Sequence, residues 1–162
     1  MPLRPAYPDP VNEVAARVTA GGVVVLGALA IALAQPWLAP VLAAGFALRV
    51  GWGPRFSPLA LLASRVVVPR LGVAPRPVPG PPKRFAQLVG LVFCAAATLL
   101  FALGAATAGY AVLGALVAAA ALESLAGFCL GCRAFALLMA VGVIPPEVCE
   151  RCNDLRAVPT RP

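Results

Sequence analysis

The sequence contains no histidine among its 162 residues, and only six of them are acidic. Without histidine the chain has no imidazole to ligate a metal or haem, to serve a Ser-His-Asp triad or to shuttle protons. Charged residues make up 12% of the chain, against about 25% in soluble domains. The hydrophobic share is 61%, which excludes disorder, because disordered segments have low hydrophobicity. The composition therefore predicts an integral membrane protein of one domain.

Two long runs without a charged residue organise the chain. Residues 18–48 form a run of 31, and residues 85–122 form a run of 38. One helical span needs about 20 apolar residues, so each run is long enough for two. The first run is interrupted at Gln35-Pro36-Trp37 and the second at 104–109 (GAATAG). We therefore predict an all-α integral membrane protein of two helical hairpins, with four transmembrane helices and short interfacial helices.

The predicted segments follow from these runs. In 54–84, Ser57-Pro58 is typical of an N-cap followed by proline at the first helical position. It predicts a short interfacial helix that ends at Pro69, followed by an extended proline-rich linker over 73–82. The five segments are a cytosolic tail (1–13), a first transmembrane hairpin (14–53), a basic interfacial helix with the linker (54–84), a second transmembrane hairpin (85–132), and an interfacial helix with a cytosolic tail (133–162).

The charges predict the orientation of the chain. The net charge is +7, and the basic residues flank the apolar runs, a pattern of membrane orientation rather than of nucleic-acid binding. The two turns carry no charge, whereas the connection between the hairpins is basic and has no acid. Its cations are Arg55, Arg65, Arg70, Arg76, Lys83 and Arg84. The positive-inside rule then predicts a multi-pass protein of the bacterial inner (plasma) membrane with both termini in the cytoplasm.

Four of the five cysteines form two CxxC pairs, Cys129/Cys132 and Cys149/Cys152. Both pairs are expected at the cytoplasmic side, where a permanent disulfide is disfavoured. Cys132 and Arg133 would begin a helix that runs to Ile144, and a helix N-terminus beside a cation stabilises a thiolate. This pattern predicts thiol–disulfide redox or sulfur handling at Cys129 and Cys132, with the second pair as a resolving pair.

The same cysteines support two other interpretations. The spacing C-x2-C-x16-C-x2-C lies in the range of four-cysteine zinc sites, and an iron–sulfur cluster takes the same ligands. In that case Cys129, Cys132, Cys149 and Cys152 would hold a structural metal without catalysis. A third function is transport of a small solute or metal ion along a path that includes the first pair and Glu123.

Glu123 is the only acid inside an apolar run. A buried carboxylate is costly without a partner, and Arg49, at similar depth in another span, is the expected counter-ion. Glu123 either locks the hairpins together or carries protons for the nearby thiols. Cys94 lies in a stripe of small residues with Gly90 and Thr98, where close helix packing is expected.

Several stretches give the chain a family resemblance. They read GPRFSPLA after the first hairpin, PPKRFAQ at the entry to the second, and GFCLGCR at its end. Together they resemble the bacterial membrane family catalogued as domain of unknown function 4395. The resemblance implies a small multi-span protein with a CxxC, and an association with thioredoxin-like or sulfur-transfer proteins. The expected partners are thus the lipid bilayer and such a protein, with a homo-oligomer as an open alternative.

Overall fold

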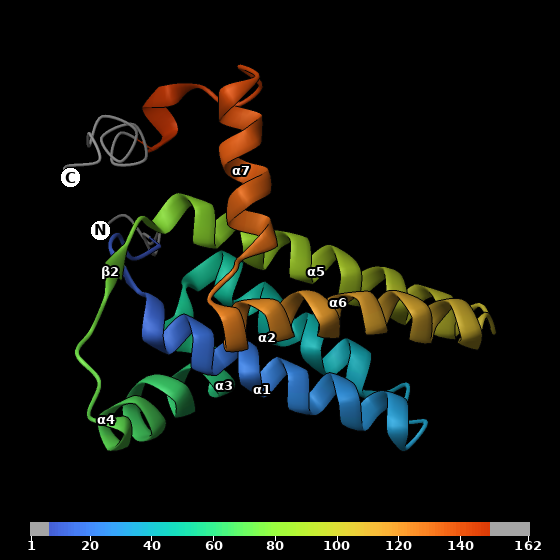
Figure 1. The fold of residues 1–162 in the computed structure, drawn as a ribbon. Coiled ribbons are helices and arrows are strands. Elements are labelled where there is room, and N and C mark those ends of the chain that lie inside the picture. The colour runs from blue at the N-terminus through green and yellow to red at the C-terminus, as the bar shows by residue number, and fades with distance from the viewer. Residues whose placement is uncertain (1–6, 150–162) are drawn as a thin grey trace, which may run out of the picture.

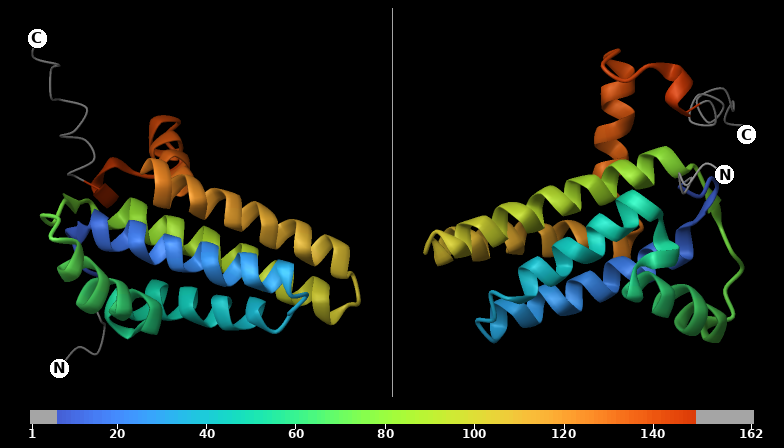
Figure 2. Two further views of the ribbon diagram at one scale, coloured as in Figure 1. Left: turned by 60° about the horizontal axis from the view of Figure 1, so that its bottom comes forward. Right: turned by 180° about the vertical axis from the view of Figure 1, so that it is seen from behind.

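The computed structural model describes residues 7–149, which form a bundle of helices (Figure 1). Four helices make up the bundle, and a shorter helix, α7, packs against α5 and projects away from the bundle (Figure 2). The helices of the bundle are α1 (Glu13–Ala32), α2 (Leu38–Trp52), α5 (Gly80–Ala102) and α6 (Ala106–Ala126), and the projecting helix is α7 (Leu130–Ala140). The fold is thus mainly helical, and the two predicted hairpins are confirmed as helix pairs.

Both hairpin turns lie at the same end of the bundle, and the described termini lie at the other (Figure 1). The first turn contains the predicted break at Gln35-Pro36-Trp37. There the Trp37 indole N–H donates a hydrogen bond to Gln35 Oε1 at 2.7 Å. The second turn is made possible by Gly104, whose φ of +77° is accessible to glycine without strain. The connection between the hairpins, with α3, α4 and β2, lies at the end of the bundle opposite the two uncharged turns (Figure 1).

The end that holds the termini is tied together by backbone pairing that the sequence did not indicate. Strand β1 (Val11–Asn12) runs antiparallel to β2 (Pro77–Val78), with Val11 opposite Val78. Asn12 also caps α1, because its Oδ1 accepts from the Val14 amide at 3.0 Å. The N-terminal segment and the proline-rich linker are thereby held against the same helix end.

The connection contains a helical segment that differs from its prediction. It runs through η1 (Pro54–Phe56), α3 (Pro58–Leu62), a π-helical turn η2 (Ala63–Val67) and α4 (Val68–Leu71). The prediction that Pro69 ends the helix is wrong, since helical backbone continues to Leu71. The π-helical turn explains this result, because its wider spacing accommodates the missing N–H and the ring of Pro69. The segment ends instead at Gly72, whose φ is +62°.

The interior of the bundle is apolar, and so is much of its exterior. The buried core contains Val23, Ala30, Ala39, Leu42, Phe46, Cys94, Ala97, Leu113, Leu116 and Ala120. Cys94 is fully buried, as its place in the small-residue stripe predicted, and Gly90 packs against the Phe46 ring. Large apolar side chains are also exposed along the bundle, among them Val25, Leu29, Val41, Val92, Leu99 and Leu122.

Three described helices are long and apolar enough to cross a membrane: α1, α5 and α6. Helix α2 is also apolar but has only 15 residues, or about 22 Å at 1.5 Å per residue. That length is shorter than a hydrocarbon core of about 30 Å. The composition and length of these helices are compatible with a membrane protein.

Candidate thiol site

The first CxxC pair lies where α6 ends and α7 begins. Gly127 closes α6 in the left-handed conformation, with φ +68°, and Cys129 is the N-cap residue of α7. The backbone N–H of Cys132 donates to the Cys129 sulfur at 3.4 Å. Helix α7 therefore begins at Leu130, two residues earlier than predicted, and it ends at Ala140 rather than Ile144. The earlier start places both cysteines at the helix N-terminus, where a thiolate is stabilised.

Glycine between the cysteines allows α7 to approach α5 closely. A Cβ built on Gly131 would lie 2.6 Å from the Cα and the Cβ of Ala86 in α5, closer than real Cβ contacts. The Phe85 and Phe135 rings, 5.7 Å apart, add an aromatic contact between the same helices. The close approach holds the N-terminal turn of α7 against the second turn of α5.

A buried ion pair lies beside the thiols. The Lys83 Nζ donates to Glu123 Oε1 at 2.7 Å, and both side chains are largely buried. The predicted pairing of Glu123 with Arg49 is therefore wrong. The reason is that α5 begins at Gly80, with Pro81 and Pro82 in its first turn, so Lys83 enters the bundle with the helix. Glu123 holds α5 and α6 together through this pair.

The two thiols are electrostatically unequal. The pKa of Cys129 is lowered, chiefly because the Cys132 thiol donates a hydrogen bond to its thiolate. Burial and the Glu123 charge oppose this effect, and the Lys83 charge adds to it. The pKa of Cys132 is raised, because Cys132 gives up its donated bond on ionising and because it is buried. Cys129 is therefore the thiol poised to ionise first.

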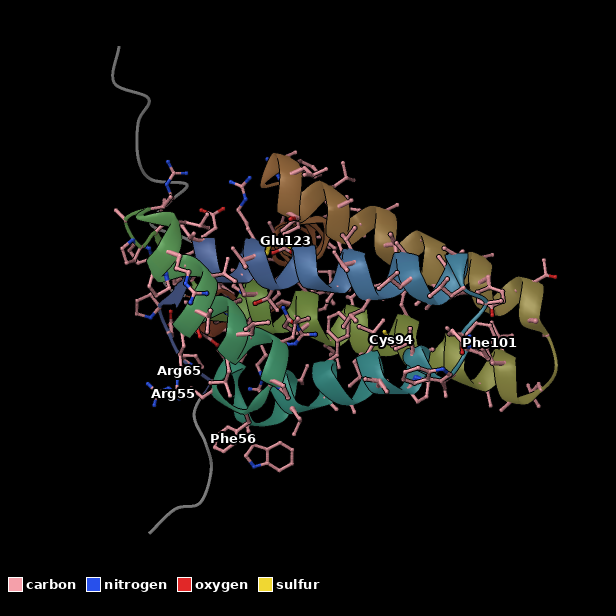
Figure 3. The ribbon with its side chains drawn as sticks, turned by 90° about the horizontal axis from the view of Figure 1, so that it is seen from below. Arg55, Phe56, Arg65, Cys94, Phe101 and Glu123 are labelled. Atoms are coloured by element: carbon pink, nitrogen blue, oxygen red, sulfur yellow. The ribbon has the colours of Figure 1, made fainter. Side chains whose placement is uncertain are left out.

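Cys129 lines a partly open cavity between the helices, which we call the inner cavity. Its volume is about 240 Å³, and it is bordered by Val23, Phe46, Arg49, Gln87, Glu123 and Cys129. Figure 3 shows the position of Glu123 along the bundle, between the terminal end and Cys94. The cavity thus brings a buried thiol, a carboxylate and a guanidinium around one apolar space.

The other predicted site residues are placed differently. Arg133 is exposed, and its guanidinium carbon lies 5.1 Å from the centre of the Phe128 ring. Cys149 ends η3 (Pro146–Cys149), where it is buried and disulfide-bonded, and Cys152 lies outside the described residues. The expectation that neither cysteine pair holds a disulfide is therefore wrong for Cys149, whereas Cys129 and Cys132 are free thiols. Within 7–149, no three cysteine, aspartate or glutamate side chains come together as metal ligands. The structure thus gives no support to the four-cysteine metal site.

Sequence reasoning missed two polar residues of the site. The sequence analysis places Lys83 in the basic segment 54–84, outside the second hairpin, although the Pro-Pro pair before it is a signal for a helix start. Gln87, one turn further along α5, has a buried Oε1 with no hydrogen-bond partner in the described part of the chain. Both side chains come from the first two turns of α5. Gln87 borders the inner cavity together with Cys129, whereas Lys83 is linked to that cavity through its ion pair with Glu123.

The fold and site define a small helical protein with a CxxC pair at a helix N-terminus, next to a buried ion pair. The chain belongs to the family described as Domain of unknown function (DUF4395), whose pattern matches residues 11–140. This range includes Lys83, Glu123, Cys129 and Cys132 and ends before the second cysteine pair. Neither the curated proteins nor the solved structures contain a match to the chain.

Proposed function

We propose that this protein carries out thiol–disulfide exchange at Cys129 and Cys132 as an integral protein of the bacterial inner membrane. The observation that carries the proposal is the place of Cys129, which caps α7, accepts from the Cys132 amide and lines the inner cavity. A CxxC at a helix N-terminus combines a stabilised thiolate with a second thiol within reach.

The exchange proceeds in two steps. The Cys129 thiolate attacks one sulfur of a partner's disulfide, forms a mixed disulfide and releases the other partner sulfur as a thiolate. Cys132 then loses its proton and attacks the Cys129 sulfur, which releases the second partner thiolate. Two electrons pass from the cysteine pair to the partner, which is a disulfide of the thioredoxin-like or sulfur-transfer class. The lowered pKa of Cys129 and the raised pKa of Cys132 suit this order.

Equilibration with dithiothreitol tests the redox chemistry. We expect the Cys129–Cys132 disulfide to form and reduce reversibly with one midpoint potential, read by alkylation of free thiols and mass spectrometry. A variant in which Cys149 and Cys152 are both serine should keep the same midpoint, because the first pair needs no resolving partner. If Cys129 and Cys132 stay reduced at every ratio of oxidised to reduced dithiothreitol, the proposed chemistry is excluded.

The membrane part of the proposal rests on the exterior of the bundle. Large apolar side chains are exposed on all of the long helices, and such a surface is unfavourable in water. Trp37 immediately precedes α2, and Trp52 is the last residue of α2. Both side chains are exposed, as expected for residues at the two membrane interfaces. We propose four spans, with α2 crossing a locally thinned bilayer and both termini in the cytoplasm.

Labelling from each side of the membrane tests this topology. Single cysteines are introduced at Ala105 in the second turn and at Arg76 in the linker, in a background with the native cysteines replaced by serine. In intact cells, an impermeant maleimide should label position 105 and leave position 76 unlabelled until the membrane is opened. Labelling of both positions in intact cells would contradict four spans.

A further inference from the structure

A second cavity at the terminal end of the bundle is strongly basic. Its volume is about 500 Å³, and we call it the basic cavity; it is bordered by Tyr7, Arg49, Arg55, Arg65, Lys83 and Gln87. No acidic side chain lines it within the described residues. Among residues 7–149, Lys83 is paired with Glu123, whereas Arg49, Arg55 and Arg65 form no ion pair. Figure 3 shows Arg55 and Arg65 at this end of the bundle, and both line the cavity.

Arg49, which lines the basic cavity, has a hydrogen-bond donor that the described residues leave without an acceptor. The residue is only 3% exposed, and its Nε has no hydrogen-bond partner among residues 7–149. The guanidinium instead lies 4.2 Å from the centre of the Phe46 ring. A buried guanidinium with an unmet N–H donor is costly, because its charge is removed from water and no acceptor replaces the lost hydrogen bond. The arrangement therefore calls for an anionic ligand that accepts hydrogen bonds from Arg49.

The other lining groups indicate the class of anion. Planar guanidinium groups match the oxygens of phosphate and sulfate in bidentate pairs. The pKa of Tyr7 is raised to about 12 by burial, so its hydroxyl remains a donor. A volume of about 500 Å³ is within the range of small-molecule sites and admits more than a bare ion. We propose that the basic cavity binds the phosphate or sulfate group of an organic anion through Arg49, Arg55 and Arg65.

Calorimetric titration of the detergent-solubilised protein with glycerol 3-phosphate at low ionic strength tests this site. Glycerol 3-phosphate should bind, and glycerol should not. The Arg55→Gln and Arg65→Gln variants should each weaken binding about tenfold or more, because each removes a charge-assisted contact. Both side chains are exposed, so these variants are expected to fold. Arg70→Gln, which changes an exposed arginine of α4 outside the cavity, is the matched control and should bind as the wild type does.

The source of the phosphate is decided by repeating the titration in nanodiscs. If phosphatidylglycerol discs lower the affinity for glycerol 3-phosphate about tenfold relative to phosphatidylcholine discs, the ligand is a lipid headgroup. Equal affinity in both identifies a free organic phosphate. The proposal is overturned if glycerol 3-phosphate does not bind in detergent, or if Arg70→Gln weakens binding as much as Arg65→Gln does. None of these results depends on the redox chemistry of Cys129 and Cys132.

Discussion

Replacing Lys83 by methionine is expected to destabilise the protein by about 3–5 kcal/mol. The substitution leaves the Glu123 carboxylate largely buried between α5 and α6 after removing the ammonium group that donates to it at 2.7 Å. A buried charge that loses its partner has neither water nor a counter-ion to stabilise it. The free energy of unfolding, measured by titration with denaturing detergent, gives the size of the loss.

The double variant Lys83→Met with Glu123→Leu separates the unpaired charge from lost packing. It should recover most of the stability, because replacing both members of a buried pair by apolar side chains is often neutral or favourable. Arg84→Met is the matched control: Arg84 is exposed and donates to the Val50 carbonyl at 3.1 Å. It should cost about 1 kcal/mol or less. A loss for Lys83→Met no larger than that for Arg84→Met would show that the ion pair does not stabilise the bundle.

Replacing Cys132 by serine should trap a partner on the protein. Without the Cys132 thiol, the mixed disulfide on Cys129 has no neighbouring sulfur to resolve it. Incubation with glutathione disulfide or oxidised thioredoxin should therefore give a stable adduct on Cys129, at least tenfold more abundant than in the wild type. Mass spectrometry of the intact protein and of its peptides measures the yield and the site.

The reciprocal variant provides the control for this trap. Cys129→Ser should form little adduct, because the remaining Cys132 thiol has a raised pKa and is a poor nucleophile at neutral pH. Both variants should carry serine at Cys149 and Cys152, so that the second pair cannot take part. Equal yields of adduct on Cys129→Ser and Cys132→Ser would contradict the assigned order of attack and resolution.

The two hairpins could be predicted because their signals are local. Each apolar run is broken by residues that stop a helix, Gln35-Pro36 in the first and Gly104 in the second, and the helices end within a few residues of them. The resemblance carried by the GFCLGCR stretch was confirmed by the family match over 11–140. Thiol chemistry, the membrane topology and the partner stay predictions.

Contacts between distant segments could not be predicted in the same way. The sequence predicts that the second transmembrane hairpin begins after the last charge, at residue 85, but α5 begins at Gly80 and brings Lys83 into the bundle. A single sequence does not show that a cation near a helix start will face an acid 40 residues away. The pairing of Val11 with Val78 was missed for the same reason, since each strand has only two residues. Both features depend on tertiary packing rather than on a local pattern.

Alkylation of Cys129 and Cys132 as a function of pH tests the proposed thiol site most directly. The thiolate fraction rises with pH, so a lowered pKa moves the half-maximal alkylation rate to lower pH. Iodoacetamide labelling of the wild-type protein, read for each peptide and normalised to its limiting rate, gives both profiles in one experiment. We expect the Cys129 midpoint to fall below the ordinary thiol value of about 8.5 and Cys132 to stay largely unlabelled at that pH. Coincident midpoints near 8.5 would contradict an activated thiol at this site.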